Sequence, residues 1–123
     1  MEPEKCEEHL VKLFCDKDYS SYLIMYARFL TSLYLKQNAI LFEGFFEGPD
    51  LATFCTREVE TFDNEADQLH IIGVTNYLGI RVEINSVRPT GKIDVMTIPE
   101  DGAKESFLAH LLFVPGHYDA LYP

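Results

Sequence analysis

The sequence has few basic residues and few cysteines. Ten lysines and arginines stand against twenty aspartates and glutamates, which gives a net charge of −10. Proteins bind nucleic acids largely by neutralising phosphates with lysine and arginine, and anionic membrane surfaces attract the same residues. We therefore expect neither a nucleic acid nor a membrane as a partner. The three cysteines show no paired spacing, which favours a reducing compartment, the cytosol or the nucleus.

Long hydrophobic runs and a targeting segment are also missing. The longest apolar stretch, residues 22–30, is interrupted by Arg28 and is too short to span a bilayer. The first residues, MEPEKCEEHL, are acidic where a signal peptide would be basic and then apolar. Hydrophobic residues nevertheless make up 47% of the sequence, enough for a packed core. The sequence therefore predicts a single globular domain or a part of one.

The N-terminal part of the sequence has the periodicity of helices. Residues 3–14 predict a short amphipathic helix, and residues 19–37 predict a longer one that Asp16 or Asp18 can cap. The longer helix is apolar nearly all round. Since such helices are buried on most sides, we expect it to form the spine of the domain.

Aromatic and apolar residues continue beyond this helix. Residues 41–48 predict a loop whose phenylalanines, Phe42, Phe45 and Phe46, tuck against the core. A further helix is expected to start at Asp50, and Cys55 falls on its apolar stripe. Burial raises the pKa of a thiol and leaves little thiolate, so Cys55 is interpreted as an inert core residue.

The next helix is expected at residues 66–78. Acidic residues precede it, and Gly79 follows it in the position that favours glycine after a helix. His70 lies within this helix, where we expect it to hydrogen-bond locally or to face solvent.

The C-terminal part has the patterns of strands. Ile80, Val82 and Ile84 alternate with polar residues, which predicts a half-buried strand, and residues 93–98 predict another. Residues 107–114 are apolar on both faces, as in a central strand, and Pro115-Gly116 suits a type II turn before an antiparallel return. The expected fold is α+β, with helices at about 3–78 packed on a small, mostly antiparallel sheet at about 79–123.

A histidine and an aspartate follow this turn, in LLFVPGHYDALY at residues 111–122. Side chains alternate faces along an extended strand, so His117 and Asp119 are expected on one face and Tyr118 on the other. Asp119 can then orient the imidazole and stabilise its charge, as a general base requires. The plain alternative is a hairpin with an unrelated surface histidine and aspartate, because this spacing is common.

The segment PGHYDALY resembles the C-terminal signature of the otubain family, cysteine deubiquitinases with the papain-related OTU fold. Upstream segments resemble otubains in the same order: FLTSLYL at 29–35, FFEG at 45–48, FCTREVE at 54–60 and LHIIGVTNYLGIRVEI at 69–84. The resemblance implies that His117 is the catalytic base and that Asp119 orients it. It also implies ubiquitin or polyubiquitin as a partner, with a ubiquitin-conjugating enzyme as a second one.

The sequence lacks the Asp-Gly-Asn-Cys motif that carries the otubain nucleophile. Met1 corresponds to the middle of an otubain domain, so the resemblance implies only the C-terminal half. Cys6 and Cys15 flank an acidic segment, which disfavours a thiolate. We therefore expect no nucleophile here and no activity from these residues alone.

No metal or cofactor is expected. Cys6, His9 and Cys15 fall close together, but no second Cys/His pair follows at the spacing of a zinc finger.

Three hypotheses about function follow. The chain is part of an isopeptidase that needs a complementary N-terminal half, or a non-catalytic module that binds ubiquitin or a conjugating enzyme, or a truncated product without activity. One half of such a domain would also expose strand edges and apolar helix faces, which favours self-association unless a partner covers them.

Overall fold

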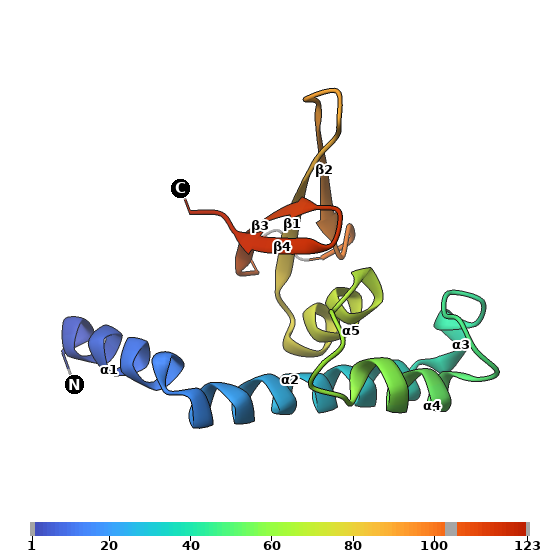
Figure 1. Cartoon of the computed structure of the whole chain (residues 1–123), viewed down its shortest axis with the longest axis horizontal. Helices are drawn as coiled ribbons and strands as arrows, with labels where there is room; N and C mark the ends of the chain where they lie inside the picture. Colours follow the sequence, from blue (N-terminus) through green and yellow to red (C-terminus); the bar gives the residue numbers. More distant parts are fainter. Residues whose placement is uncertain (1, 103–105, 123) are drawn as a thin grey trace. The chain divides into compact units, whose positions relative to one another are not determined.

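A computed structural model describes residues 2–102 and 106–122 of the chain. The chain folds as two compact units, residues 1–65 and residues 66–123. The first unit is helical, and the second contains a helix and the sheet, so the α+β prediction is confirmed (Figure 1). No helix of the described residues is long and apolar enough to cross a membrane.

Two helices make up most of the first unit. Helix α1 spans Pro3–Cys15 and helix α2 spans Lys17–Gln37. Asp16 separates them, and its side chain accepts hydrogen bonds from the backbone N–H groups of Asp18 and Tyr19. Asp16 is thus the N-cap of α2, one of the two residues expected for this role.

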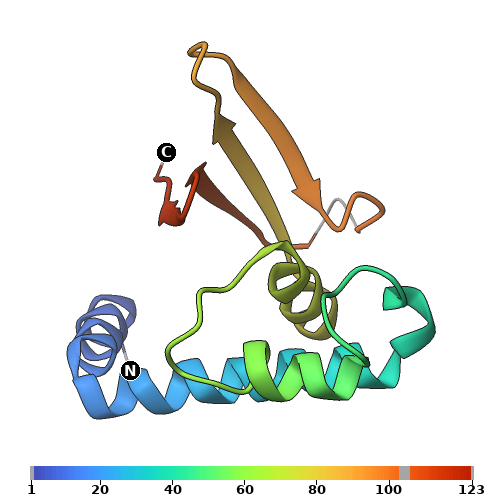
Figure 2. The same ribbon diagram turned by 45° about the vertical axis from the view of Figure 1, so that its right-hand side comes forward.

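Three shorter elements complete the first unit: α3 at Ala39–Phe42, α4 at Leu51–Phe54 and the π-helix η1 at Cys55–Val59. Figures 1 and 2 both show α4 and η1 alongside α2. The Asp50 side chain caps α4 as expected. The core of this unit consists of residues from α2, α3, α4 and η1, namely Thr31, Ser32, Leu35, Phe42, Leu51, Phe54, Cys55 and Val59.

One expectation about burial was wrong, and a second was confirmed only in part. Only Thr31, Ser32 and Leu35 of α2 are buried, so α2 is not buried on most sides. Of the phenylalanines, Phe42 is buried but Phe45 is 75% exposed. The physical reason is the same in both cases, because an apolar sequence pattern does not state whether other polypeptide covers the side chains.

Helix α5, Gln68–Leu78, opens the second unit with a capping box. The Asp67 side chain accepts hydrogen bonds from the N–H groups of Leu69 and His70, and His70 Nδ1 accepts one from the Asp67 N–H. His70 is buried, so the local hydrogen bond is confirmed and the solvent-facing alternative is not. Gly79 ends the helix with a φ of 67°, as its position predicted.

Four strands form one mixed sheet in the order β2-β1-β3-β4. They are β1 at Arg81–Val87, β2 at Ile93–Ile98, β3 at Leu108–Val114 and β4 at His117–Ala120. The β1–β2 and β3–β4 pairs are antiparallel, and the inner β1–β3 pair is parallel. Figure 2 shows the β1–β2 hairpin along its length. The prediction of a mostly antiparallel sheet with an inner third strand is confirmed.

One face of the sheet packs against α5. Val82, Ile84 and Ile98 form its buried core, and Ile71 and Ile72 of α5 lie against them. The helices end at Leu78 and the strands begin at Arg81, close to the expected division of helical and sheet parts. That the whole chain forms one domain stays a prediction.

Candidate functional site

The candidate site lies on β4, directly after the turn that joins it to β3. Gly116 adopts a φ of 84°, the left-handed conformation that a type II turn requires of its third residue. The turn sets the register in which His117 pairs with Val114 and Asp119 pairs with Leu112. Because these positions alternate along the strands, both side chains project from the same face, as expected.

His117 and Asp119 contact each other within this strand. Nε2 of His117 lies 3.2 Å from Oδ2 of Asp119. With Nε2 facing the carboxylate, Nδ1 is the ring nitrogen left to meet a reacting group. The two side chains are 64% and 70% exposed, so water screens the pair in this chain.

The opposite face of β4 holds the strand against the rest of the unit. The rings of Phe113 and Tyr118 lie 4.7 Å apart between centroids. Burial raises the pKa of Tyr118, and the nearby charge of Asp67 raises it further. Tyr118 is therefore an anchor, and His117 and Asp119 face away from the α5 side of the sheet.

A second histidine–carboxylate pair shares the face of His117. Nδ1 of His110, on β3, lies 3.1 Å from Oε1 of Glu83, on β1, and Asn85 donates a hydrogen bond to the same oxygen. The register places His110 two residues from Leu112, the partner of Asp119. This pair could not be predicted from sequence patterns, because only the pairing of β1 with β3 brings the two residues together.

No described cysteine is set up as a nucleophile. Cys55 is fully buried, and burial raises the pKa of its thiol although the Ser32 hydroxyl and the Lys36 charge act against this shift. The prediction that Cys55 is a core residue is confirmed. Cys6 and Cys15 are exposed on α1. Within residues 2–102 and 106–122, no three His, Cys, Asp or Glu side chains are grouped to hold a metal ion.

Two hollows of the second unit lie away from the pair. One, of about 310 Å³, is lined by residues that include Thr75, Asn76 and Pro99. The other, of about 320 Å³, is lined by residues that include Gln68, Ile72 and Met96. Neither has His117 or Asp119 in its lining, so the pair lies on an open strand face rather than in either hollow.

Comparison with known proteins decides the family. Residues 1–123 match the family described as Peptidase C65 Otubain. The chain belongs to this family. Human ubiquitin thioesterase OTUB1 is 36% identical over 115 residues, which are 92% of this otubain chain and 42% of the human protein. The otubain-like ubiquitin thioesterase of Caenorhabditis briggsae is 35% identical over 123 residues, with similar coverage of 94% and 42%.

Solved structures confirm the fold of this otubain chain. A complex of ceOTUB1 with ubiquitin aldehyde and UBC13~Ub superimposes with a TM-score of 0.83 and 32% identity. The match covers 94% of this chain and 48% of the solved one. The OTU domain of OTUD1 is 17% identical with a TM-score of 0.68, which shows the fold alone. This otubain chain thus spans less than half the length of human OTUB1, of the Caenorhabditis briggsae protein and of the solved ceOTUB1 chain.

Proposed function

We propose that residues 1–123 supply the histidine–aspartate half of an otubain-type ubiquitin isopeptidase. His117 is the general base, and Asp119 orients its ring. The observation that supports this proposal is the 3.2 Å contact between Nε2 and the carboxylate, on the strand that ends an otubain-like segment. The catalytic thiol comes from polypeptide outside these residues.

The proposed chemistry uses the free ring nitrogen. Nδ1 of His117 takes the proton from a thiol, and the thiolate attacks the carbonyl carbon of the isopeptide bond between ubiquitin and a lysine. The imidazolium then gives this proton to the departing lysine amine. Asp119 stabilises the imidazolium in between and holds the ring in one tautomer, so it acts as a positioning residue without taking the proton.

Residues 1–123 alone are expected to be inactive. Cys55 is buried with a raised pKa, and no described cysteine is paired with a histidine base. Without a thiolate, covalent catalysis loses nearly all of its rate. Ubiquitin with a thiol-reactive group at its C-terminus should therefore not label this chain, whereas rapid labelling of the chain alone would contradict the proposal.

A complementation assay tests the role of the pair. The chain is mixed with the part of human OTUB1 that it does not match, and labelling of that second polypeptide by the ubiquitin probe is followed. We expect labelling that His117→Ala abolishes and Asp119→Asn weakens. His9→Ala is the matched control, because His9 is an exposed histidine of α1 in the first unit. Equal labelling with His117→Ala would refute a general-base role.

A second candidate function is a non-catalytic module that binds ubiquitin or a conjugating enzyme. It is supported by the solved relatives, which are complexes with ubiquitin aldehyde and with UBC13~Ub or UBCH5B~Ub. The exposure of His117 and Asp119 also suits a binding surface. Calorimetric titration with ubiquitin and with ubiquitin-charged conjugating enzyme distinguishes the two. Tight binding that survives His117→Ala, without labelling in the complementation assay, would favour the module.

A further inference from the structure

The pair formed by His110 and Glu83 lies next to the His117–Asp119 pair on the same face of the sheet. Nδ1 of His110 is 3.1 Å from Oε1 of Glu83. Asp119 pairs with Leu112, two residues along β3 from His110, so His110 and Asp119 are diagonal neighbours on adjacent strands. Diagonal positions are roughly 7–8 Å apart, which is within the reach of long side chains.

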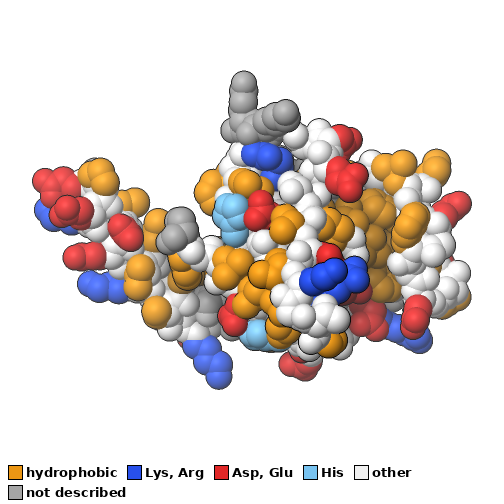
Figure 3. Space-filling model, turned by 90° about the horizontal axis from the view of Figure 1, so that it is seen from above, with side chains coloured by type: hydrophobic (Ala, Val, Ile, Leu, Met, Phe, Trp, Pro, Cys, Tyr) orange, Lys and Arg blue, Asp and Glu red, His pale blue; other side chains and the backbone are white. Residues whose placement is uncertain are grey.

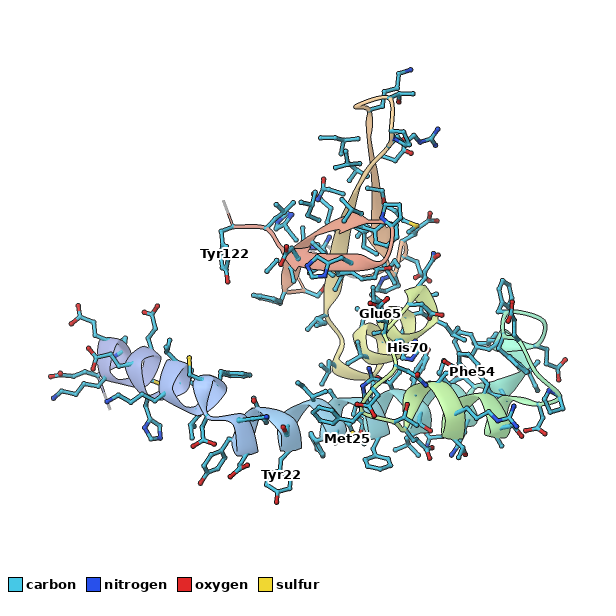
Figure 4. The ribbon with its side chains drawn as sticks, viewed as in Figure 1. Tyr22, Met25, Phe54, Glu65, His70 and Tyr122 are labelled. Atoms are coloured by element: carbon cyan, nitrogen blue, oxygen red, sulfur yellow. The ribbon has the colours of Figure 1, made fainter. Side chains whose placement is uncertain are left out.

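The end of β4 is held against β3 at His110. The backbone N–H of Leu121 donates a hydrogen bond to the carbonyl oxygen of His110 at 2.9 Å. Tyr122, the next residue, is 88% exposed, and in Figure 4 its ring points away from the strands. Asp119 is therefore kept beside His110 by the backbone, and the ring of Tyr122 does not cover this part of the sheet.

The charged groups that face His110 come from β1 and β4. Strand β1 presents Glu83 and Arg81, and hydrogen bonds tie Arg81 to the loop before β3. Strand β4 presents Asp119 and, further along, His117. The side chains that β2 presents on this face are uncharged, namely Ile93, Val95 and Thr97.

This face of the sheet is open to water. The side chains of His110 and Glu83 are 42% and 27% exposed, and that of Asp119 is 70% exposed. Figure 3 shows pale blue histidine groups directly beside red acidic groups at the surface. The third histidine of the second unit, His70, lies on α5, which packs against the opposite face (Figure 4). A proton from solvent can therefore reach His110 without a change in the fold.

The protonation state of His110 decides what its ring can offer to Asp119. A neutral imidazole has a single N–H, and the contact with the Glu83 carboxylate places it on Nδ1, so Nε2 carries a lone pair. Imidazoles take up a second proton between about pH 8 and pH 5. Nε2 then becomes a donor on a positively charged ring. Asp119 has a carboxylate oxygen for it, because only Oδ2 contacts His117.

We propose that protonated His110 is a second partner of the Asp119 carboxylate and thereby weakens the His117–Asp119 pair in mild acid. The inference rests on the proposed function, since it assigns a control to the same pair. Asp119 then shares its negative charge between two imidazolium groups, so it stabilises that of His117 less. His110 contacts no reacting atom, so it acts as a positioning residue.

A double-mutant cycle tests this link in the chain alone. Urea unfolding at about pH 5.5 and about pH 8 compares wild type, His110→Gln, Asp119→Asn and the variant with both changes. At the lower pH the effects on the unfolding equilibrium constant should depart from independence by at least about twofold. At the higher pH they should be independent. A merely structural contact would give the same coupling at both pH values.

A second cycle is the matched control and combines His110→Gln with Asp94→Asn. Asp94 belongs to the same sheet but pairs with Ser86, so it lies on the opposite face. No coupling is expected in this cycle at either pH. Circular dichroism checks that each variant is folded.

The complementation assay supplies a second readout. Between about pH 8 and about pH 5.5, wild type should lose at least about twofold more of its labelling than His110→Gln loses. Coupling that is absent or equal at the two pH values would overturn the inference, and so would an unchanged pH profile of labelling with His110→Gln. A chain that shows the coupling but supports no labelling at any pH would refute the proposed function and leave the link between His110 and Asp119 standing.

Discussion

Lys36 Nζ lies 2.7 Å from Glu60 Oε1, and this ion pair joins the C-terminal part of α2 to the residue that follows η1. The buried Ser32 hydroxyl donates to the same carboxylate oxygen. The backbone N–H of Glu60 donates to Cys55 O at 2.8 Å, the wide hydrogen bond of a π-helix. The last turn of η1 thus presents Glu60 to two residues of α2.

Glu60→Gln should lower the free energy of unfolding by about 1 kcal/mol at neutral pH, since a charge-assisted hydrogen bond becomes a neutral one. The hydrogen bond from Lys36 lowers the pKa of Glu60 below 4.5, followed by that from Ser32. The stabilisation is therefore present above pH 4.5 and is lost as the pH falls through the folded pKa. Urea unfolding at several pH values measures this.

The same ion pair makes a prediction for alkaline pH. The hydrogen bond to Glu60 raises the pKa of Lys36 above 10.5. The contribution of Lys36 is fully present below pH 10.5 and is lost as the pH rises through the folded pKa. A stability difference between wild type and Glu60→Gln that stays constant into acid would contradict the assignment for Glu60, and one that stays constant through alkaline pH would contradict the assignment for Lys36.

Asp67→Ala should destabilise the second unit by about 1 kcal/mol. The backbone N–H groups of Leu69 and His70 at the start of α5 lose the carboxylate that accepts their hydrogen bonds. Asp67→Asn should lower the stability by only a few tenths of a kcal/mol, since the amide oxygen still accepts hydrogen bonds from the N–H groups at the start of the helix. Thermal melts followed by circular dichroism compare the two. Asp63→Ala is the control, as Asp63 is exposed and precedes the cap. Equal melting of Asp67→Ala and wild type would mean that the capping box contributes nothing.

The three thiols should differ sharply in reactivity. Cys6 and Cys15 are exposed, whereas Cys55 is buried and its pKa is raised by burial. A disulfide reagent such as DTNB should modify the two exposed thiols of the native chain quickly. Cys55 should react only as fast as its surroundings open. Replacing Cys6 and Cys15 by serine should remove the fast phase, and all three thiols should react together in denaturant.

Gly116→Ala should loosen the strand that carries the candidate site. A side chain at a φ of 84° is strained by about 1 kcal/mol or more, and the register of β4 depends on this turn. Amide hydrogen exchange should become faster at residues 117–120 than at β1 and β2. Gly44→Ala, which changes a glycine of φ 82° in the first unit, should leave the exchange of β4 unchanged.

Local patterns were sufficient for much of the fold and for one part of the site. The position of Cys55 on an apolar stripe predicted its burial, and Gly79 marked the end of α5. His117 and Asp119 lie on one short strand, so alternation alone predicted their shared face. The catalytic roles of these two residues stay predictions.

Features that depend on distant parts of the chain could not be predicted in this way. His110 and Glu83 are 27 residues apart, and their contact follows from the parallel register of β1 and β3. The exposure of α2 depends on which polypeptide surrounds it, which no pattern within the helix states. Phe45 and Phe46 are neighbours in sequence, yet the ring of Phe46 packs against Phe54 while Phe45 is 75% exposed.

Arg28 has consequences for which substitutions the chain tolerates. Its planar guanidinium donates hydrogen bonds to three backbone carbonyl oxygens in two successive segments. The ammonium of a lysine at this position could not reach all three in this geometry. In a saturation mutagenesis screen for folded protein, codon 28 should accept almost nothing, while codons 21 and 24 on neighbouring turns accept many replacements. If substitutions unfold the protein at position 28 but not at the neighbouring positions, then Arg28 is required for hydrogen bonds within the first unit rather than for contact with a partner.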